Sequence, residues 1–332
     1  MRTMNERMII SKTPLRITFV GGGSDLKEYY SNYGRGAVLS AAINKYIYIV
    51  VNKKFDSDIR VSYSKTEIVH SVEQIEHPTV REALKLLRIE GGIEILSISD
   101  IPSGGTGLGS SSSFLVGLLN ALHAWKGEYV SPQELAEEAV YIERIVLNEP
   151  GGKQDQYMAA YGGIQKIDFY SDERVEVRPV VSNSKALEEF EESLVLLYTG
   201  IQRKSTTIHN DQRSSVKIKS ANYEEMVKLA DEAFIHLNNG NYIEIGRMIH
   251  KNWILKKSLS SGISNQNIDE WYNRAIGHGA IGGKIIGAGG GGFLLFMADQ
   301  GKRNDIIECL SELRMETFKF EPEGSRIIYV GN

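Results

Sequence analysis

The sequence predicts a protein that contains both helices and strands and is divided into two domains. The chain has 332 residues, which is enough for one large domain or two ordinary ones. Alternating apolar residues predict most strands before residue 183, whereas apolar residues at helical spacing predict helices between residues 222 and 277. Charged and small residues at 183–192 separate these regions. We therefore expect one domain at residues 1–182 and a second at residues 183–332.

The composition favours a packed, soluble protein. Hydrophobic residues make up 42% of the chain, and the formal net charge of −4 argues against a general nucleic-acid or membrane binder. Cys309 is the only cysteine, so neither an internal disulfide nor a zinc site built from thiolates is expected. Residues 1–8 lack the apolar core of a signal peptide, and the longest apolar region, 37–51, is interrupted by Asn44 and Lys45. We expect a cytoplasmic protein.

Local patterns predict the elements in order. Strands are expected at residues 8–20, 37–52, 60–63, 92–99, 162–169, 175–180, 193–200, 293–297, 316–320 and 326–330. Helices are expected at residues 26–33, 78–89, 114–125, 135–147, 156–161, 222–237, 242–260, 265–277 and 302–313. Pro14 predicts a bulge or an edge in the first strand. Ser131 and Glu134 predict a capping box before the 135–147 helix.

A loop rich in glycine and serine joins the 92–99 strand to the 114–125 helix. Its sequence is Pro102-Ser-Gly-Gly-Thr-Gly-Leu-Gly-Ser-Ser-Ser-Ser113. Glycines let the backbone approach a ligand closely and adopt positive φ. Free N–H groups and the helix dipole favour an anion, and the serines either cap the helix or reach a metal bound to phosphate. The loop therefore predicts a cradle for a triphosphate.

Three alternative roles for this loop fit the sequence less well. A Walker A loop requires a lysine, and this stretch contains none. A dinucleotide fingerprint requires Gly-x-Gly-x-x-Gly directly after a first strand, and the spacing here differs. A flexible linker would not need the apolar helix that follows.

The pattern Pro-x-Gly-x-Gly-Leu-Gly-Ser-Ser-Ser resembles the ATP loop of the GHMP kinases, which include galactokinase, homoserine kinase, mevalonate kinase and phosphomevalonate kinase. Pro14-Leu-Arg-Ile with Gly21-Gly-Gly-Ser-Asp25 resembles their first motif, and Gly287-Ala-Gly-Gly-Gly-Gly292 their third. The resemblance implies an α+β fold of two domains, the N-terminal one like domain 2 of ribosomal protein S5 and the C-terminal one ferredoxin-like. ATP and the acceptor would lie between them.

The third glycine stretch has two alternative interpretations. Residues 287–292 formally match Gly-x-Gly-x-x-Gly, but a strand follows and not a helix, which argues against dinucleotide binding. A bare hairpin with an overlong glycine turn would be unfavourable in chain entropy. The resemblance implies a backbone wall near the phosphates and the acceptor.

The resemblance also implies the residues that bind ATP and Mg²⁺. The ATP-binding residues would be Pro102, Gly104, Gly105, Thr106, Gly107, Leu108, Gly109, Ser110, Ser111 and Ser112. Ser111 and Glu143 would hold Mg²⁺, which prefers carboxylate and hydroxyl oxygens. Glu149 is the nearest alternative to Glu143, and Glu143 itself can be read as a solvated helix residue.

Two residues match the catalytic positions of these kinases. Asp155 follows Glu143 by a dozen residues and would orient or deprotonate the acceptor hydroxyl. Arg16 would stabilise negative charge near that hydroxyl. Alternatively, Asp155 merely caps the helix that begins at residue 156, and Arg16 is an ordinary strand residue.

Matching residues also predict the binding site of the sugar. They are Gly22, Gly23, Ser24, Asp25, Gly152, Lys153, Asp155, Arg203, Lys204, Gly289 and Gly290. Asp25 would accept hydrogen bonds from sugar hydroxyls, although an Asx turn or helix cap is the alternative. Arg203 and Lys204 would bind a phosphate already on the substrate, or would form a solvated turn. For the pocket of the adenine ring we expect the region 63–66.

Three longer stretches of sequence narrow the resemblance to the kinases of D-glycero-D-manno-heptose 7-phosphate. The stretches are Gly-Gly-Gly-Ser-Asp-Leu-x-Glu-Tyr-Tyr, His77-Pro-Thr-Val-Arg-Glu-Ala-Leu and Gly-Gly-Lys-Gln-Asp-Gln-Tyr, with Ser24 where threonine is commoner. These enzymes phosphorylate the anomeric hydroxyl, and the product supplies activated heptose for bacterial capsule or lipopolysaccharide. The alternatives are a kinase of a free sugar such as L-fucose or galactose, and a catalytically silent sensor. The sequence leaves the oligomeric state open.

Overall fold

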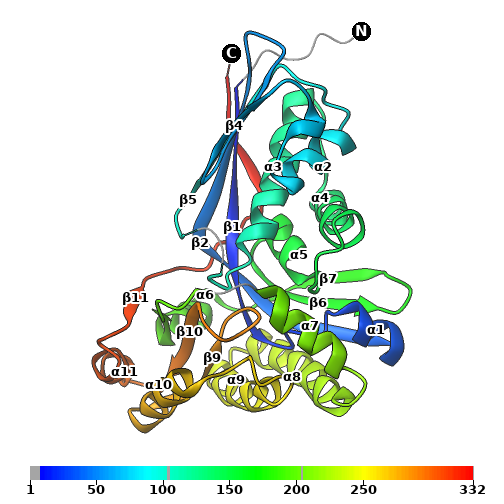
Figure 1. Ribbon diagram of the computed structural model, residues 1–332. Helices are drawn as coiled ribbons and strands as arrows, with labels where there is room; N and C mark the ends of the chain where they lie inside the picture. The colour runs from blue at the N-terminus through cyan, green and yellow to red at the C-terminus, as the bar shows by residue number, and fades with distance from the viewer. Residues whose placement is uncertain (1–7, 103–104, 203–204, 332) are drawn as a thin grey trace.

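The computed structural model describes residues 8–102, 105–202 and 205–331 and contains two β-sheets with helices packed around them (Figure 1). The larger sheet has eight strands: β1 (Ile9–Val20), β2 (Arg35–Lys53), β3 (Ile59–Ser62), β4 (Thr66–Val69), β5 (Ile93–Ser99), β6 (Ile164–Tyr170), β7 (Val175–Pro179) and β12 (Arg326–Val330). The smaller sheet has four strands: β8 (Leu194–Tyr198), β9 (Ala280–Ile285), β10 (Phe293–Ala298) and β11 (Arg314–Glu316). The α+β expectation is confirmed.

Eleven α-helices accompany the sheets in the described part of the chain. They are α1 (Lys27–Tyr33), α2 (Pro78–Leu86), α3 (Ser110–Lys126), α4 (Pro132–Val140), α5 (Gln154–Tyr161), α6 (Ser184–Ser193), α7 (Ser205–Ser215), α8 (Ser220–Asn238), α9 (Tyr242–Lys257), α10 (Gln266–Gly277) and α11 (Arg303–Cys309). A 3₁₀ turn, η1 (Val72–Gln74), and a π-helical turn, η2 (Tyr141–Val146), complete them. Among residues 8–102, 105–202 and 205–331, no helix has the length and apolarity needed to cross a membrane.

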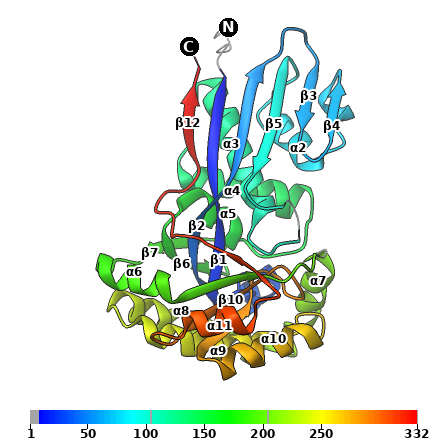
Figure 2. The ribbon, with the colours of Figure 1, turned by 90° about the vertical axis from the view of Figure 1, so that its left-hand side faces the viewer.

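The long strand β2 organises the larger sheet. One of its edges pairs antiparallel with β1, and its other edge pairs first with β6 and then with β5. The strand order is β12-β1-β2-β5-β3-β4 (Figure 2). The β1–β2 register shifts between Pro14 and Leu15, which confirms the bulge predicted from the proline. Since the C-terminal strand β12 pairs with β1, the chain returns to the larger sheet after completing the smaller one.

Different groups of helices cover the two ends of this sheet. Helix α3 lies along β1 and β2, with α2, α4 and α5 beside it (Figure 1). Helices α8 and α9 pack against the other end of the same strands, and α9 also packs on β9 of the smaller sheet. In α3, a Cβ on Gly117 would lie 2.6 Å from Thr13 Oγ1, so the missing side chain allows the helix to approach β1 closely.

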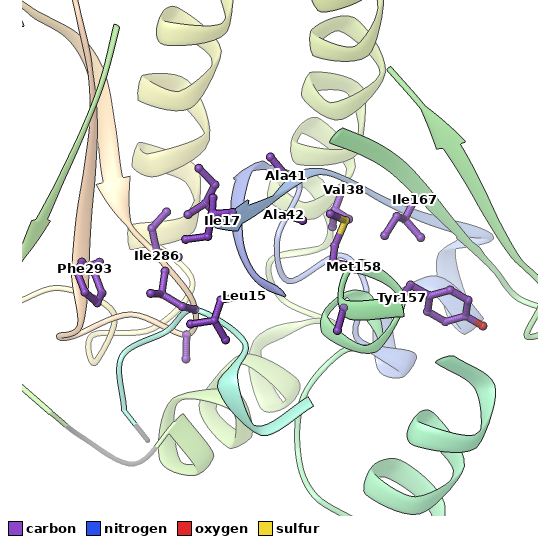
Figure 3. Close-up of a cluster of buried hydrophobic side chains, with 14 of the residues drawn as sticks. Leu15, Ile17, Val38, Ala41, Ala42, Tyr157, Met158, Ile167, Ile286 and Phe293 are labelled. Carbon is purple, nitrogen blue, oxygen red and sulfur yellow. The ribbon is translucent and has the colours of Figure 1, made fainter. Parts of the chain in front are cut away.

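One hydrophobic cluster spans both sheets. Figure 3 shows side chains of β1, β2, α5 and β6 packed beside Ile286 and Phe293, which flank the loop between β9 and β10. Leu15 and Ile286 are both fully buried in this cluster. Since burial of apolar surface is the main favourable term in folding, a shared core holds the strands of the two sheets together.

The structure corrects several boundaries expected from sequence. Helix α3 begins at Ser110 and not at 114, and the helix expected at 135–147 changes to π geometry at Tyr141. Residues 184–193, expected as a boundary segment, form α6 with Asn183 as its N-cap. Strand β4 was not expected. The capping box of Ser131 and Glu134 is confirmed, whereas the division at residue 183 stays a prediction.

A buried carboxylate ties α8 to the larger sheet. Asp168, on β6, is 0% exposed and accepts hydrogen bonds from Arg35, Lys166 and Arg178 on β2, β6 and β7. Lys166 and Arg35 also pair with Asp231 on α8. The ammonium of Lys166 is itself buried, so its neutralisation depends on these two carboxylates.

Replacement of Asp168 tests this connection. We expect Asp168→Ala to lower the free energy of unfolding by about 3–5 kcal/mol, because it leaves the buried Lys166 ammonium with one partner fewer. Urea denaturation followed by circular dichroism measures the change. The control is Asp172→Ala, which removes an exposed carboxylate from the turn after β6. Equal midpoints for the two variants would contradict the assigned role.

Candidate active site

Two glycine loops from different sheets meet backbone to backbone. Gly107, in the loop before α3, has φ +80°, and a Cβ on it would lie 2.3 Å from the carbonyl oxygen of Ile286. A Cβ on Gly287, in the β9–β10 loop, would lie 2.5 Å from Gly107 Cα. Any side chain at either position would separate the loops, which accounts for the glycines in physical terms. The hairpin predicted as an alternative does form between β9 and β10, but its turn packs against the first loop.

These loops enclose a cleft of about 230 Å³, here called the glycine-loop cleft. Its lining includes Gly105, Thr106, Gly107, Gly109, Ser110, Ser111, Ser112, Glu143, Asp155, Gly287 and Gly289. Leu108 is buried behind it, and Gly290 donates its N–H to Ile263 O. Gly104 lies outside the described residues. The cleft thus brings together most of the residues predicted to bind ATP.

The N-terminus of α3 points its free backbone groups at this cleft. Gly109 is the N-cap residue with φ +78°, and Ser110, Ser111 and Ser112 form the first helical turn. The serines therefore do not cap the helix, which was one of the two roles predicted for them. Their N–H groups have no intrahelical acceptor, and the helix dipole adds partial positive charge. This arrangement suits an anion such as a phosphate.

Glu143 projects from the π turn η2 towards the same serines. Ser111 Oγ donates to Oε1 at 2.9 Å, and Ser112 Oγ donates to Oε2 at 2.8 Å. Gln156 also donates to Oε2. The side chain is 1% exposed, whereas Ile145 in the same turn is largely exposed, so the solvated position considered for Glu143 does not hold. Such π turns are frequent at functional sites.

The donor set at Glu143 fits a magnesium ion. A carboxylate and the hydroxyl of Ser111 are hard oxygen donors at the edge of the cleft. Among the described ranges, no cluster of three or more His, Cys, Asp or Glu residues forms a cage, and Mg²⁺ usually needs none because it keeps waters and phosphate ligands. Glu149 also lines the cleft, and burial, followed by the charge of Glu143, raises its pKa.

Arg16 and Asp155 form a bidentate ion pair beside the cleft. Arg16 Nε and Nη2 donate to the two carboxylate oxygens, each at 2.7 Å. Arg16 Nη1 donates to Gly107 O, and the Arg16 backbone N–H donates to Leu108 O. Asp155 lies in the first turn of α5, where Lys153 is the N-cap residue, so the capping alternative for Asp155 does not hold.

A second pocket, here called the Asp25 pocket, lies on the other side of this pair. Most of its lining residues differ from those of the glycine-loop cleft. Its lining includes Arg16, Thr18, Gly22, Gly23, Asp25, Arg144, Gly152, Gln154, Asp155, His209, Gln212, Lys256 and Lys284. Asp25 is buried and accepts N–H groups from Gly23 at 3.0 Å and Gln154 at 3.2 Å. Burial, followed by the charge of Asp155, raises the pKa of Asp25. Asp25 thus faces the pocket with both carboxylate oxygens held by backbone N–H groups.

Some predicted sugar ligands lie elsewhere. Ser24 Oγ donates to Ala37 O and accepts from Ala37 N, so it anchors the turn to β2 and does not line the pocket. Lys153 lines a neighbouring cavity of about 410 Å³, where its ammonium pairs with Glu173. This cavity shares Asp25 and Arg144 with the Asp25 pocket. Arg203 and Lys204 lie outside the described residues.

Several pocket residues were not predicted from sequence. They are Arg144, His209, Gln212, Lys256 and Lys284. Arg144 donates to Gly152 O and Glu149 O and so fixes the turn before α5. The one available signal was Lys256, which follows the buried residues Asn252 and Trp253 at helical spacing and therefore places a lysine on the buried face of α9.

A fourth cavity, of about 760 Å³, adjoins the outer end of the first glycine loop. Its lining includes Tyr63, Ser64, His77, Phe114 and Pro102, together with Ser111 of the cleft. The ring of His77 lies edge-on to Tyr63 and stacked on Phe114. Burial lowers the pKa of His77, and its Nδ1 is buried with no hydrogen-bond partner among the described residues. This aromatic cavity suits a flat heterocycle with polar edges.

Known proteins share this architecture. The family described as GHMP kinases N terminal domain matches residues 78–163, and GHMP kinases C terminal matches residues 226–313. D-glycero-alpha-D-manno-heptose 7-phosphate kinase of Campylobacter jejuni is 31% identical over 96% of this chain and 98% of that protein. L-fucokinase/L-fucose-1-P guanylyltransferase of Bacteroides fragilis is 24% identical over 89% of this chain and 35% of that protein.

A solved structure is similar over the full chain. The crystal structure of a D-glycero-D-manno-heptose 1-phosphate kinase from Bacteroides thetaiotaomicron has a TM-score of 0.81 and 25% identity. The likeness covers 98% of this chain and 100% of that one. These matches confirm the resemblance that the three glycine motifs predicted.

Substitution of Gly152 tests the position of Asp25. An alanine Cβ at 152 would lie 1.8 Å from Asp25 Oδ2, so the carboxylate must move out of its place in the pocket. We expect Gly152→Ala to raise the KM for the acceptor by at least about 10-fold, because hydrogen bonds to a charged acceptor are lost, and to leave the KM for ATP unchanged. Steady-state kinetics measures both values. Gly277→Ala, where a Cβ meets no atom within 4 Å, is the control. An unchanged acceptor KM would refute the placement.

Proposed function

We propose a specific reaction for this chain, which belongs to the GHMP kinase family: transfer of the γ-phosphoryl group of ATP to the anomeric C1 hydroxyl of D-glycero-D-manno-heptose 7-phosphate. The product would be the 1,7-bisphosphate, a precursor of activated heptose for capsule or lipopolysaccharide. The observation that carries the proposal is the Arg16–Asp155 pair, which lines both the glycine-loop cleft and the Asp25 pocket. A group at this junction can act on both a nucleotide and an acceptor.

The cleft supports a simple arrangement of the nucleotide. The triphosphate lies along the loop from Gly105 to Ser112, at the N-terminus of α3, and adenine occupies the cavity beside Tyr63 and His77. Ser111 and Glu143 are the residues that would hold Mg²⁺. A Mg²⁺ ion held by these residues would supply positive charge that offsets the charge of the phosphates.

At the junction, Asp155 orients the C1 hydroxyl for in-line attack on the γ-phosphorus. The Arg16 guanidinium holds its carboxylate at 2.7 Å, so the carboxylate oxygens are fixed in position to orient the hydroxyl and to receive its proton. Arg16 supplies fixed positive charge beside the oxygen where negative charge develops. An anomeric hydroxyl is more acidic than an ordinary alcohol, so the demand on the base is smaller.

A kinase of a free sugar is the second candidate. The relative from Bacteroides fragilis, described as an L-fucokinase, supports it. Arg203 and Lys204, which we assign to the phosphate of the acceptor, would have no such role in a free-sugar kinase. The higher identity to the heptose 7-phosphate kinase over the full chain favours the first candidate.

The acceptor can be identified directly by ³¹P NMR. We expect a new anomeric phosphate signal when the protein and Mg-ATP meet D-glycero-D-manno-heptose 7-phosphate, and little signal with the unphosphorylated heptose, galactose or L-fucose. Equal or faster turnover of a free sugar would reject the heptose phosphate and keep the kinase. No phosphate transfer to any sugar would reject both candidates.

Replacement of the carboxylate tests the role of Asp155. We expect Asp155→Asn to lower kcat by about 10²-fold or more, because the amide cannot accept the proton of the hydroxyl. A coupled assay for ADP measures the rate, and circular dichroism checks the fold. Asp172→Asn, an identical change at an exposed position, should keep wild-type turnover. Near-wild-type activity of the Asp155 variant would exclude the assigned role.

A further inference from the structure

The Asp25 pocket contains buried ammonium groups without a counter-ion. Lys256, on α9, is 4% exposed, and its Nζ donates to Gly287 O. Lys284, on β9, is fully buried and donates to Thr18 O and Phe19 O. Within residues 8–102, 105–202 and 205–331, neither ammonium lies within ion-pair distance of a carboxylate. Carbonyl oxygens satisfy hydrogen bonds but leave the positive charges uncompensated.

The carboxylates of the pocket are already engaged. Asp155 is neutralised by its bidentate contact with Arg16. Asp25 accepts two backbone N–H groups and is the remaining negative charge. The described walls therefore carry more positive than negative charge around an enclosed space. A ligand that brings negative charge would complete this site, whereas a neutral sugar would not.

The triphosphate does not account for this excess. Lys256 and Lys284 line the Asp25 pocket and are absent from the lining of the glycine-loop cleft. In the cleft, phosphate charge already meets the N-terminus of α3 and the oxygen donors that fit Mg²⁺. The anion that neutralises Lys256 should therefore be part of the acceptor.

Neutral donors lie in the same pocket. His209 and Gln212, one turn apart on α7, both line it, and His209 also lines the glycine-loop cleft. His209 Nδ1 and Gln212 Nε2 are buried without a hydrogen-bond partner among the described residues. Burial, followed by the charge of Lys256, lowers the pKa of His209 to about 4, so the imidazole is neutral at physiological pH. Unsatisfied buried polar atoms are rare and indicate a missing partner, here a ligand rich in acceptor oxygens.

We infer that Lys256 binds the phosphate group of a sugar phosphate acceptor, with His209 and Gln212 donating to the same ligand, and that Lys256 thereby selects the sugar phosphate over the free sugar. This inference rests on the proposed function, which requires a phosphorylated acceptor. It assigns the recognition to α9 and α7, in addition to any contribution from Arg203 and Lys204.

The test compares two adjacent lysines of α9. We expect K256M to lower kcat/KM for D-glycero-D-manno-heptose 7-phosphate by about 10²-fold, and kcat/KM for the unphosphorylated heptose by less than about 3-fold, because only the phosphate requires the ammonium. K257M is the matched control, since Lys257 pairs with Asp269 away from the pocket. Thermal melting of each variant checks the fold.

The outcomes separate this inference from the proposed function. If the wild-type protein uses both acceptors equally, both are overturned. If the wild-type protein prefers the sugar phosphate and K256M keeps that preference, the inference alone is overturned, and the phosphate is recognised elsewhere. An equal loss for both acceptors would also overturn it, because Lys256 would then act on the transferring phosphoryl group.

A second measurement is the pH dependence of the acceptor preference, in the wild-type protein and in K256M. Burial, followed by the charge of Arg16, lowers the pKa of Lys256 to about 8. The charged and titratable groups that line the pocket with it are Arg16 on β1, Asp25 before α1, Arg144 on η2, Asp155 on α5, His209 on α7 and Lys284 on β9. Burial lowers the pKa of Lys284 as well, so the pH profile of K256M is needed to separate the two lysines.

Only the protonated lysine attracts a phosphate dianion, and a phosphate monoester is a dianion above about pH 6. Binding should therefore be strongest between about pH 6 and about pH 8 and should weaken as pH rises further. The ratio of kcat/KM for the sugar phosphate to that for the free sugar should fall by up to about tenfold per pH unit above about pH 8 in the wild-type protein. This fall should be absent in K256M. A ratio that stays constant between about pH 7 and about pH 9.5 in the wild-type protein would overturn the inference.

Discussion

The guanidinium of Arg16 is the contact on which the geometry of the site depends. It joins three segments that are distant in sequence: strand β1, the loop at Gly107, and Asp155 in α5. The side chain is 6% exposed, so its hydrogen bonds are shielded from water and are strong. Loss of the guanidinium would remove the side-chain hydrogen bond from β1 to the loop and leave a carboxylate without its cation. The same group therefore shapes the cleft and positions the residue that would face the acceptor.

The second constraint is the absence of side chains where the two glycine loops touch. Gly107 and Gly287 approach so closely that a Cβ on either would overlap the other loop. This contact fixes the β9–β10 hairpin against the N-terminus of α3, and Lys256 reaches the pocket because its ammonium binds Gly287 O. Elements of both sheets thus form one site, held from behind by the shared hydrophobic core (Figure 3).

The parts of the site that depend on local sequence were predictable. The capping box at Ser131, the bulge at Pro14 and the strand–loop–helix order around Gly107 follow from short-range preferences. The π turn at Glu143 was not predictable from helical spacing, because it depends on the packing that turns this carboxylate inward. Ser24 was misassigned because a hydroxyl in a glycine turn can bond to the protein backbone as readily as to a bound ligand, and here it donates to Ala37 O. Lys256 and His209 enter the pocket only through tertiary packing of α9 and α7.

The charged groups of the pocket shift one another's pKa values, and Arg16 is in contact with one of them. The negative charge of Asp155 contributes to the raised pKa of Asp25, after burial. Two carboxylates in a shared pocket disfavour each other's ionised form, and the contact of the Arg16 guanidinium with Asp155 compensates one of the two charges. Arg16 also contributes, after burial, to the lowered pKa of Lys256. Because Arg16 pairs with Asp155 whereas Lys256 donates to a carbonyl oxygen, a phosphate at Lys256 and a hydroxyl at Asp155 would not compete for the same cation.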